Sequence, residues 1–154
     1  MKKKAFIVVG HAKWGKSSTL ISLIGNSRSR GNFVIGGIEF FIRRMSNDDV
    51  LDDTMLEFVQ NKLYKKGDHI ILTFCPAFGQ GRKSKNILEA LSKDFNLYFF
   101  IIKFQFKGSG EISDIEIRIL ENFGKCELVD KKIDAESRSK RLEAFILKNI
   151  KGRT

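Results

Sequence analysis

Residues 10–17 read Gly10-His11-Ala12-Lys13-Trp14-Gly15-Lys16-Ser17, and the interpretation of the whole chain begins from this stretch. It fits the pattern G-x-x-x-x-G-K-[ST] at every fixed position. The apolar run Ala5 to Val9 precedes it, and apolar residues recur at helical spacing from Ser17 to Ile24. The pattern therefore lies between a buried strand and an amphipathic helix, where a loop of this kind can hold phosphate.

This stretch resembles the Walker A motif of the P-loop NTPase superfamily, whose loop binds the phosphates of a nucleotide. Gly10 and Gly15 are expected to adopt backbone angles that residues with a Cβ avoid, so that N–H groups curl around an anion. The helix beginning near Lys16 adds its positive dipole end. The resemblance implies that Lys16 reaches the β- and γ-phosphates and that the Ser17 hydroxyl binds the Mg²⁺ bridging them.

The predicted nucleotide site covers the whole loop and the first turn of the helix. It consists of Gly10, His11, Ala12, Lys13, Trp14, Gly15, Lys16, Ser17 and Ser18. The pattern does not fix Lys13 or Trp14. Lys13 either adds a phosphate contact or is a solvated loop charge. Trp14, the one tryptophan, either covers a base or packs on a neighbouring loop, and we favour packing.

Short apolar runs alternate with segments of helical period along the chain. Strands are predicted at 5–9, 38–42, 69–75, 97–104 and 126–129, with a bend or short hairpin at Gly36 and Gly37 before the second. Helices are predicted at 17–24, 51–64, 87–95, 112–123 and 142–150. This alternation predicts an α/β three-layer sandwich with a mainly parallel five-stranded sheet. We expect one domain, residues 1–154, with the P-loop NTPase fold.

The charge of the chain bears on its partners. Lys and Arg number 28 against 18 Asp and Glu, a formal net charge of +10. Such a basic field makes nucleotides and nucleic acid plausible partners, although no nucleic-acid motif is present. The densest basic loop, Gly79 to Lys85, is expected at the same sheet edge as the phosphate loop. On the last helix, Arg138, Lys140 and Arg141 are expected to form a solvated face.

No targeting segment or membrane span is predicted. The apolar run after the basic start is too short for a signal peptide, and no stretch reaches the roughly 18 residues of a spanning helix. We therefore expect a cytoplasmic protein without a membrane partner. Cys75 and Cys126 are expected to be buried, reduced thiols, and the spacing of Cys and His argues against a zinc site.

The Mg²⁺-binding acid of the P-loop pattern is missing from its usual place. A Walker B strand normally ends in Asp, but here Thr73 stands near the end of the third predicted strand. Candidate acids elsewhere are Glu39, Asp48, Asp49 and Asp130. The acids from Asp48 to Glu57 mostly suit the first turns of a helix. Asp48 and Asp49 are the expected exceptions because they follow a strand, and with Lys16 they are our candidate catalytic residues.

Two functions remain open. A helix at 51–64, between the second and third predicted strands, resembles the arrangement in small P-loop kinases, most nearly nucleoside monophosphate kinases. The resemblance implies phosphoryl transfer that depends on ATP and Mg²⁺. The acceptor would be a small molecule or a nucleic-acid-linked group, and the sequence does not identify it. The alternative is a nucleotide-dependent switch or ATPase- or GTPase-like module with little turnover. It is favoured by the missing acid and by a short lid with little arginine. No D-x-x-G occurs, and Asn61-Lys62 lacks the acid that guanine recognition requires.

Overall fold

The computed structural model of the chain describes residues 3–25, 28 and 30–151. Its strands are β1 (Lys3–Val9), β2 (Arg30–Ile35), β3 (Ile38–Arg43), β4 (His69–Phe74), β5 (Phe95–Ile102) and β6 (Gly124–Val129). Its helices are α1 (Lys16–Ile24), α2 (Asp52–Asn61), the 3₁₀ turn η1 (Leu63–Lys66), α3 (Ser84–Asp94), α4 (Asp114–Glu121) and α5 (Ala135–Lys151).

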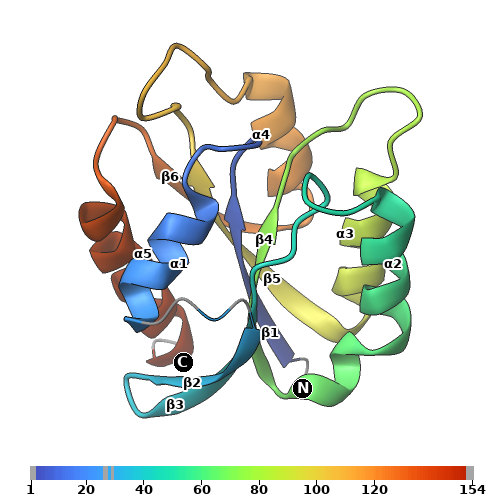
Figure 1. Cartoon of the computed structure of the whole chain (residues 1–154). Helices are drawn as coiled ribbons and strands as arrows, with labels where there is room; N and C mark the ends of the chain where they lie inside the picture. Colours follow the sequence, from blue (N-terminus) through green and yellow to red (C-terminus); the bar gives the residue numbers. More distant parts are fainter. Residues whose placement is uncertain (1–2, 26–27, 29, 152–154) are drawn as a thin grey trace.

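The six strands form one sheet in the order β2-β3-β4-β1-β5-β6, and every neighbouring pair is parallel except β2 with β3. Helices α1 and α5 pack together on one face of the sheet, and α2 and α3 pack together on the other (Figure 1). The fold class is confirmed. It is a three-layer α/β fold with a mainly parallel sheet, and the glycine-rich loop of residues 10–17 follows the first strand.

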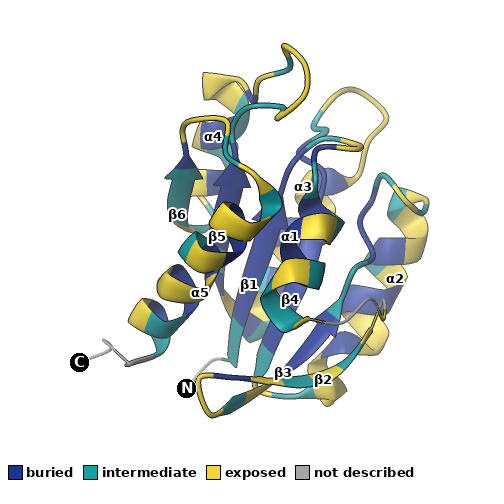
Figure 2. Cartoon of the chain, turned by 60° about the vertical axis from the view of Figure 1, so that its left-hand side comes forward, coloured by how far each residue is buried: buried dark blue, intermediate teal, exposed yellow. Residues whose placement is uncertain are grey.

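Burial explains why β1 lies in the middle of the sheet. Residues Ala5 to Val9 have no exposed surface, which is typical of a parallel strand covered on both faces. Figure 2 shows the central strands buried along most of their length, whereas the helices are buried mainly where they face the sheet. Parallel strands end at one edge, so the segments that follow β1, β3, β4, β5 and β6 gather there.

The sixth strand is an addition to the five that were predicted. Gly36 and Gly37 both have positive φ, 59° and 82°, and they join Ile35 to its cross-strand partner Ile38. Two such residues in a row form the tight turn that suits the twist of a hairpin. The hairpin expected from the two glycines is therefore present, and its first arm is a full edge strand.

Several element boundaries differ from the predicted ones. The first strand begins at Lys3, α5 begins at Ala135 rather than at 142, and β5 begins at Phe95, which was expected to end a helix. Phe95 is extended and 2% exposed, so burial in the sheet determines its conformation. The helix predicted at 51–64 ends at Asn61 and is followed by η1.

Both cysteines are free thiols, as expected, but only Cys75 is buried; Cys126 is half-buried. Among the described residues, no helix combines the length and apolar character needed to cross a membrane.

Candidate functional site

The phosphate loop, residues 10–17, leaves the end of β1 and enters α1 directly. The Gly10 N–H donates to the Phe74 carbonyl of β4 at 3.1 Å, which fixes where the loop begins. Gly15 has a φ of +95°, as expected. The same expectation is wrong for Gly10, whose φ is not positive, and Lys13 instead adopts a left-handed φ of 66°. A Cβ on Gly10 would lie 3.4 Å from Lys16 Cγ, which is van der Waals contact.

Lys16 is folded back into this loop. Its side chain is 6% exposed, and its Nζ donates to the carbonyl oxygens of Gly10 at 2.7 Å and His11 at 3.0 Å. The Nζ also lies 3.2 Å from Asp48 Oδ2, and the Asp48 side chain is 13% exposed. Two sequence-predicted site residues, 32 positions apart, are therefore in contact. The three N–H donors of this ammonium group are thus matched by two loop carbonyls and one carboxylate, which fix its position in the glycine-rich loop.

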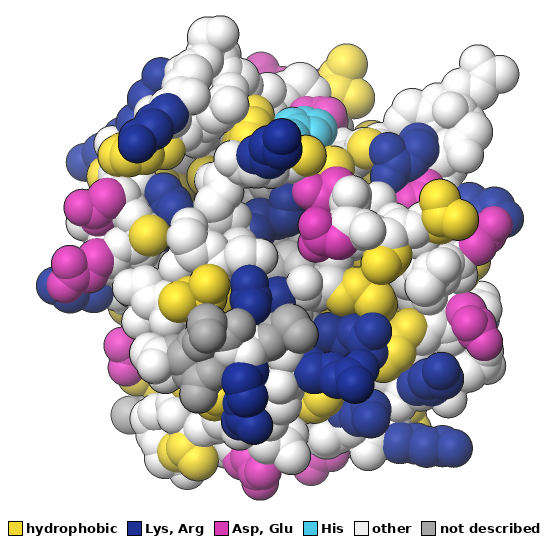
Figure 3. All heavy atoms as spheres, viewed as in Figure 1, with side chains coloured by type: hydrophobic (Ala, Val, Ile, Leu, Met, Phe, Trp, Pro, Cys, Tyr) yellow, Lys and Arg dark blue, Asp and Glu magenta, His cyan; other side chains and the backbone are white. Residues whose placement is uncertain are grey.

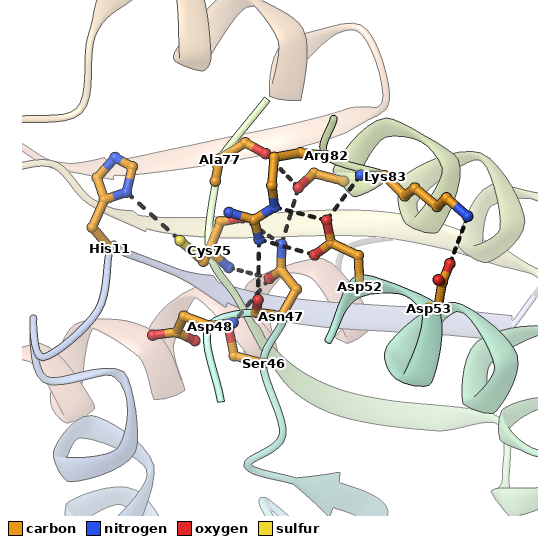
Figure 4. A network of polar contacts seen from close by, with 11 residues as sticks. His11, Ser46, Asn47, Asp48, Asp52, Asp53, Cys75, Ala77, Arg82 and Lys83 are labelled. Atoms are coloured by element: carbon orange, nitrogen blue, oxygen red, sulfur yellow. Dashed lines mark hydrogen bonds and ion pairs between the residues drawn. The ribbon is translucent and has the colours of Figure 1, made fainter. Parts of the chain in front are cut away.

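Asp48 follows β3, yet β4 lies between β3 and β1 in the sheet. The neighbouring residue Asn47 makes this crossing possible. Its Oδ1 accepts from the Cys75 N–H at 2.8 Å, and its Nδ2 donates to the Cys75 carbonyl and to Ser84 Oγ, both at 3.0 Å. Asn47 therefore holds the segment across the end of β4 and against the start of α3 (Figure 4). This role was not predicted from the sequence.

Two buried oxygen atoms at this edge have no hydrogen-bond partner within the described part of the chain. They are Oδ1 of Asp48 and Oγ1 of Thr73, the residue standing where the Walker B acid was sought. A buried carboxylate oxygen without a partner is costly unless a cation or water binds it. In the described ranges, no group of three or more His, Cys, Asp or Glu could hold a metal ion. Mg²⁺ here would need oxygens from phosphate and water as well, which is its usual behaviour.

The other candidate acids lie outside this contact. Asp49 is exposed, and its Oδ2 accepts from the Ser46 N–H at 3.3 Å. Glu39 is exposed near the start of β3, at the opposite edge of the sheet, and Asp130 is exposed after β6. Asp52 and Asp53 occupy the first turn of α2, as helix electrostatics predicts.

A cavity of about 1060 Å³, the loop cavity, lies beside the phosphate loop. Its walls come from the loop itself, from the segment after β3 and from the segment after β4. The main contributors are His11, Ala12, residues 47–53, Cys75, Ala77 and residues 81–83. The cavity is large enough for a ligand of nucleotide size.

Arg82 crosses one wall of this cavity and is held there by Asp52 (Figure 4). Its Nε and Nη2 lie 2.7 Å and 2.9 Å from the two carboxylate oxygens, and Nη2 also donates to the Asn47 carbonyl at 3.1 Å. The hydrogen bond from Arg82 lowers the pKa of Asp52, and the same bond raises the pKa of Arg82. The basic loop after β4 is thus tied to α2 by a charged pair that the sequence analysis missed.

His11 joins the phosphate loop to two neighbouring segments. Its Nδ1 lies 3.6 Å from Cys75 Sγ and its Nε2 lies 3.4 Å from Glu116 Oε2 on α4. Burial raises the pKa of the Cys75 thiol. Trp14 is 6% exposed, and a Cβ on Gly110 would lie 2.6 Å from its ring, so its predicted packing on a neighbouring loop is confirmed.

The expectation that Arg138 belongs to a solvated face is wrong. Arg138 is 4% exposed on α5, and its Nε donates to Thr19 Oγ1 at 2.8 Å. Its Nη2 lies 3.3 Å from Ser18 Oγ and 3.5 Å from the Gly15 carbonyl. Burial lowers the pKa of Arg138. Lys140 remains exposed as expected.

Arg138 has an electrostatic consequence for the phosphate loop. Within the described residues it has no carboxylate at ion-pair distance, although its hydrogen bonds are satisfied by neutral oxygens. The nearby Asp134 offsets part of its charge, and the guanidinium group adds positive charge next to the N-terminal, positive end of α1. The first turn of α1 is favourable for an anion.

The fold and site together define an α/β protein with a glycine-rich loop between its central strand and first helix. Searches against known protein families and against curated proteins find no match. Among solved structures, the chain is similar to the FeoB G-domain from Methanococcus jannaschii, at 18% sequence identity and a TM-score of 0.49. The alignment covers 96% of this chain and 99% of that one.

Proposed function

We propose that residues 10–18 bind the phosphates of a nucleoside triphosphate, and that the chain is a nucleotide-dependent binding module with slow turnover. The observation that carries this proposal is the environment of Lys16. Its side chain is 6% exposed, and its ammonium group is held by two loop carbonyls and by Asp48. Together with Arg138, it makes the space above the loop favourable for an anion.

Mg²⁺ is the expected companion of the triphosphate. Oxygen ligands suit this ion, and the buried Oδ1 of Asp48 is a carboxylate oxygen with no partner among the described residues. Ser17, in the first turn of α1, would supply its hydroxyl. The bound ion would neutralise charge on the phosphates. The protein residues themselves position the phosphates and compensate their charge.

A switch function is supported by the contact between Lys16 and Asp48. A phosphate placed at the loop would compete with Asp48 for the lysine ammonium, since both are anions. Asp48 adjoins Asn47, which is bonded to Cys75 and Ser84, and the Asn47 carbonyl accepts from Arg82. A change at Lys16 would therefore reach the segment from 46 to 53 and the start of α3.

The experiment that tests this proposal compares the binding of ATP and GTP with and without Mg²⁺. We expect Asp48→Asn to bind the nucleotide with little Mg²⁺ dependence, because the charged ligand oxygen is lost. Asp68→Asn is the matched control, since Asp68 is 80% exposed and pairs with Lys3 away from the loop cavity. If nucleotide binding depends on Mg²⁺ equally in the wild type and in Asp48→Asn, Asp48 is not a ligand of the ion.

Phosphoryl transfer to an acceptor is the second candidate. It is favoured by α2, which connects the parallel neighbours β3 and β4, and by the size of the loop cavity, about 1060 Å³. Asp49, at the wall of that cavity, is the candidate group for an acceptor hydroxyl. A screen with labelled ATP distinguishes the two functions. Labelled acceptor would support transfer, whereas slow release of phosphate alone would support the switch.

A further inference from the structure

A second hollow lies at the open end of the β2–β3 hairpin. It measures about 230 Å³, and we name it the arginine hollow. It is lined by Arg30, Arg43, Arg44, Met45, Asp49 and Val50. Figure 3 shows Lys and Arg side chains gathered in the lower middle of this face of the molecule, below a group of acidic side chains.

The charges in the arginine hollow destabilise the hairpin. Arg30 and Arg43 are direct cross-strand partners, and like charges at such positions repel. Across residues 3–25, 28 and 30–151, neither of these two guanidinium groups has a carboxylate oxygen at ion-pair distance. An anion bound between them would offset this repulsion.

The guanidinium group of Arg43 also has few hydrogen-bond acceptors. Its Nη2 donates to Met45 Sδ at 3.1 Å, and a thioether sulfur is a weak acceptor. Its guanidinium carbon lies 4.1 Å from the centre of the Phe58 ring, which holds the group in place without using its N–H donors. Burial and the charge of Arg30 both lower the pKa of Arg43. The group is therefore fixed, partly desolvated and left with donors to spare.

The arginine hollow adjoins the loop cavity without being part of it. Asp49 and Val50 line both. Asp49 is the one carboxylate in the lining of the arginine hollow, and three arginines outweigh it. The short segment from Arg44 to Asp48 connects this hollow to the contact with Lys16, so a ligand here would lie beside the nucleotide.

We propose that the arginine hollow is a second binding site, which takes a phosphate group of a ligand other than the nucleotide. Guanidinium groups match phosphate oxygens through paired N–H donors. The volume of about 230 Å³ is small for a whole nucleotide and suits a single phosphate group. That group belongs to a nucleic-acid strand or to a phosphorylated small molecule. The net charge of +10 favours the strand.

The test measures binding of a fluorescent single-stranded oligonucleotide of about 12 residues to the full chain by anisotropy, over a range of salt concentrations. The site variant is Arg30→Gln with Arg43→Gln. The control is Lys93→Gln with Arg118→Gln, which removes the same charge from exposed positions on α3 and α4. We expect the site variant to bind at least tenfold more weakly and its salt slope to fall by roughly 0.7, the value for one phosphate that is no longer neutralised. The control should stay within twofold of the wild type.

A second arm separates the two sources of phosphate. Glucose 6-phosphate and inorganic phosphate are titrated into the same proteins, and the melting temperature is followed. A rise that is lost only in the site variant, without oligonucleotide binding, assigns the hollow to a small phosphorylated ligand. Equal behaviour of the site and control variants in both arms overturns the proposal.

Two further proteins keep the result interpretable. Lys16→Ala must retain oligonucleotide binding, because loss there would place the phosphate at the phosphate loop and overturn the proposal. Arg30→Gln alone removes only an exposed side chain, so it serves if the double variant does not fold. It should weaken oligonucleotide binding at least threefold, and unchanged binding would count against the site.

Discussion

Replacing Asn47 by alanine tests how the segment after β3 is brought to the phosphate loop. Asn47 is 3% exposed, and its side chain bonds both backbone groups of Cys75 as well as Ser84 Oγ. The Ser84 hydroxyl keeps its bond to the Ala77 carbonyl, and the Cys75 carbonyl keeps a bond from the Ala77 N–H at 2.8 Å. The substitution therefore leaves one buried backbone group, the Cys75 N–H, without its partner. An unpaired buried group costs about 1–3 kcal/mol, so we expect a loss of that size.

Urea unfolding followed by circular dichroism measures this loss. The midpoint should fall while the slope m stays the same, since the folded state remains as compact. In thermal unfolding, each kcal/mol corresponds to about 2–4 °C for a chain of this size. Asn86→Ala is the control, because Asn86 is exposed on α3, and it should change stability by less than about 0.5 kcal/mol. A loss below about 1 kcal/mol for Asn47→Ala would refute the reasoning.

Two further predictions follow from the same edge of the sheet. Gly15→Ala should lower both the melting temperature and the nucleotide affinity, because Gly15 has a φ of +95° and its new Cβ would lie 2.5 Å from Arg138 Nη2. Gly25→Ala, where φ is +63° with open space around it, should lower only the melting temperature; an equal loss of affinity would contradict the argument. The pKa of Asp52 is lower in the folded chain than the value of 3.8 expected when it is unfolded. The pairing with Arg82 therefore stabilises the fold fully above that unfolded pKa. This stabilisation is lost as the pH falls through the lower, folded pKa. Arg82→Gln should therefore reduce the slope of stability against pH below about pH 4 in acid titration, and an unchanged slope would count against the pair.

The position of residues 10–17 between β1 and α1 could be predicted because the signal is local. The pattern of residues 10–17 and the apolar strand before it are adjacent in the chain. Asp48 could be singled out among the acids because it follows a strand, and strand ends meet at one edge of a parallel sheet. Its partner Lys16 was a fixed residue of the motif. The contact between them therefore joins two candidates found by separate arguments.

The parts that were missed depend on distant contacts. Asn47 bonds Cys75, 28 residues away, and no local pattern predicts that pairing. Arg138 was assigned to solvent from its charge alone. A signal was present, however, because Arg138 lies four residues before Leu142 and seven before Phe145, on the buried face of α5. The edge strand β2 was not predicted as a full strand because it has polar residues, such as Arg30 and Asn32, which are exposed.

The most direct test of the central claim is a calorimetric titration of Mg²⁺-ATP and Mg²⁺-GTP into the wild type, Lys16→Ala and Lys13→Ala. Lys13 is the matched control, because it lies in the same loop, carries the same charge and is exposed. We expect the wild type to bind at least one of the two nucleotides. Lys16→Ala should lose that binding by at least a hundredfold, while Lys13→Ala stays within about fivefold. Wild-type protein that binds neither nucleotide, or a Lys16→Ala variant that binds as tightly as the wild type, would contradict the account.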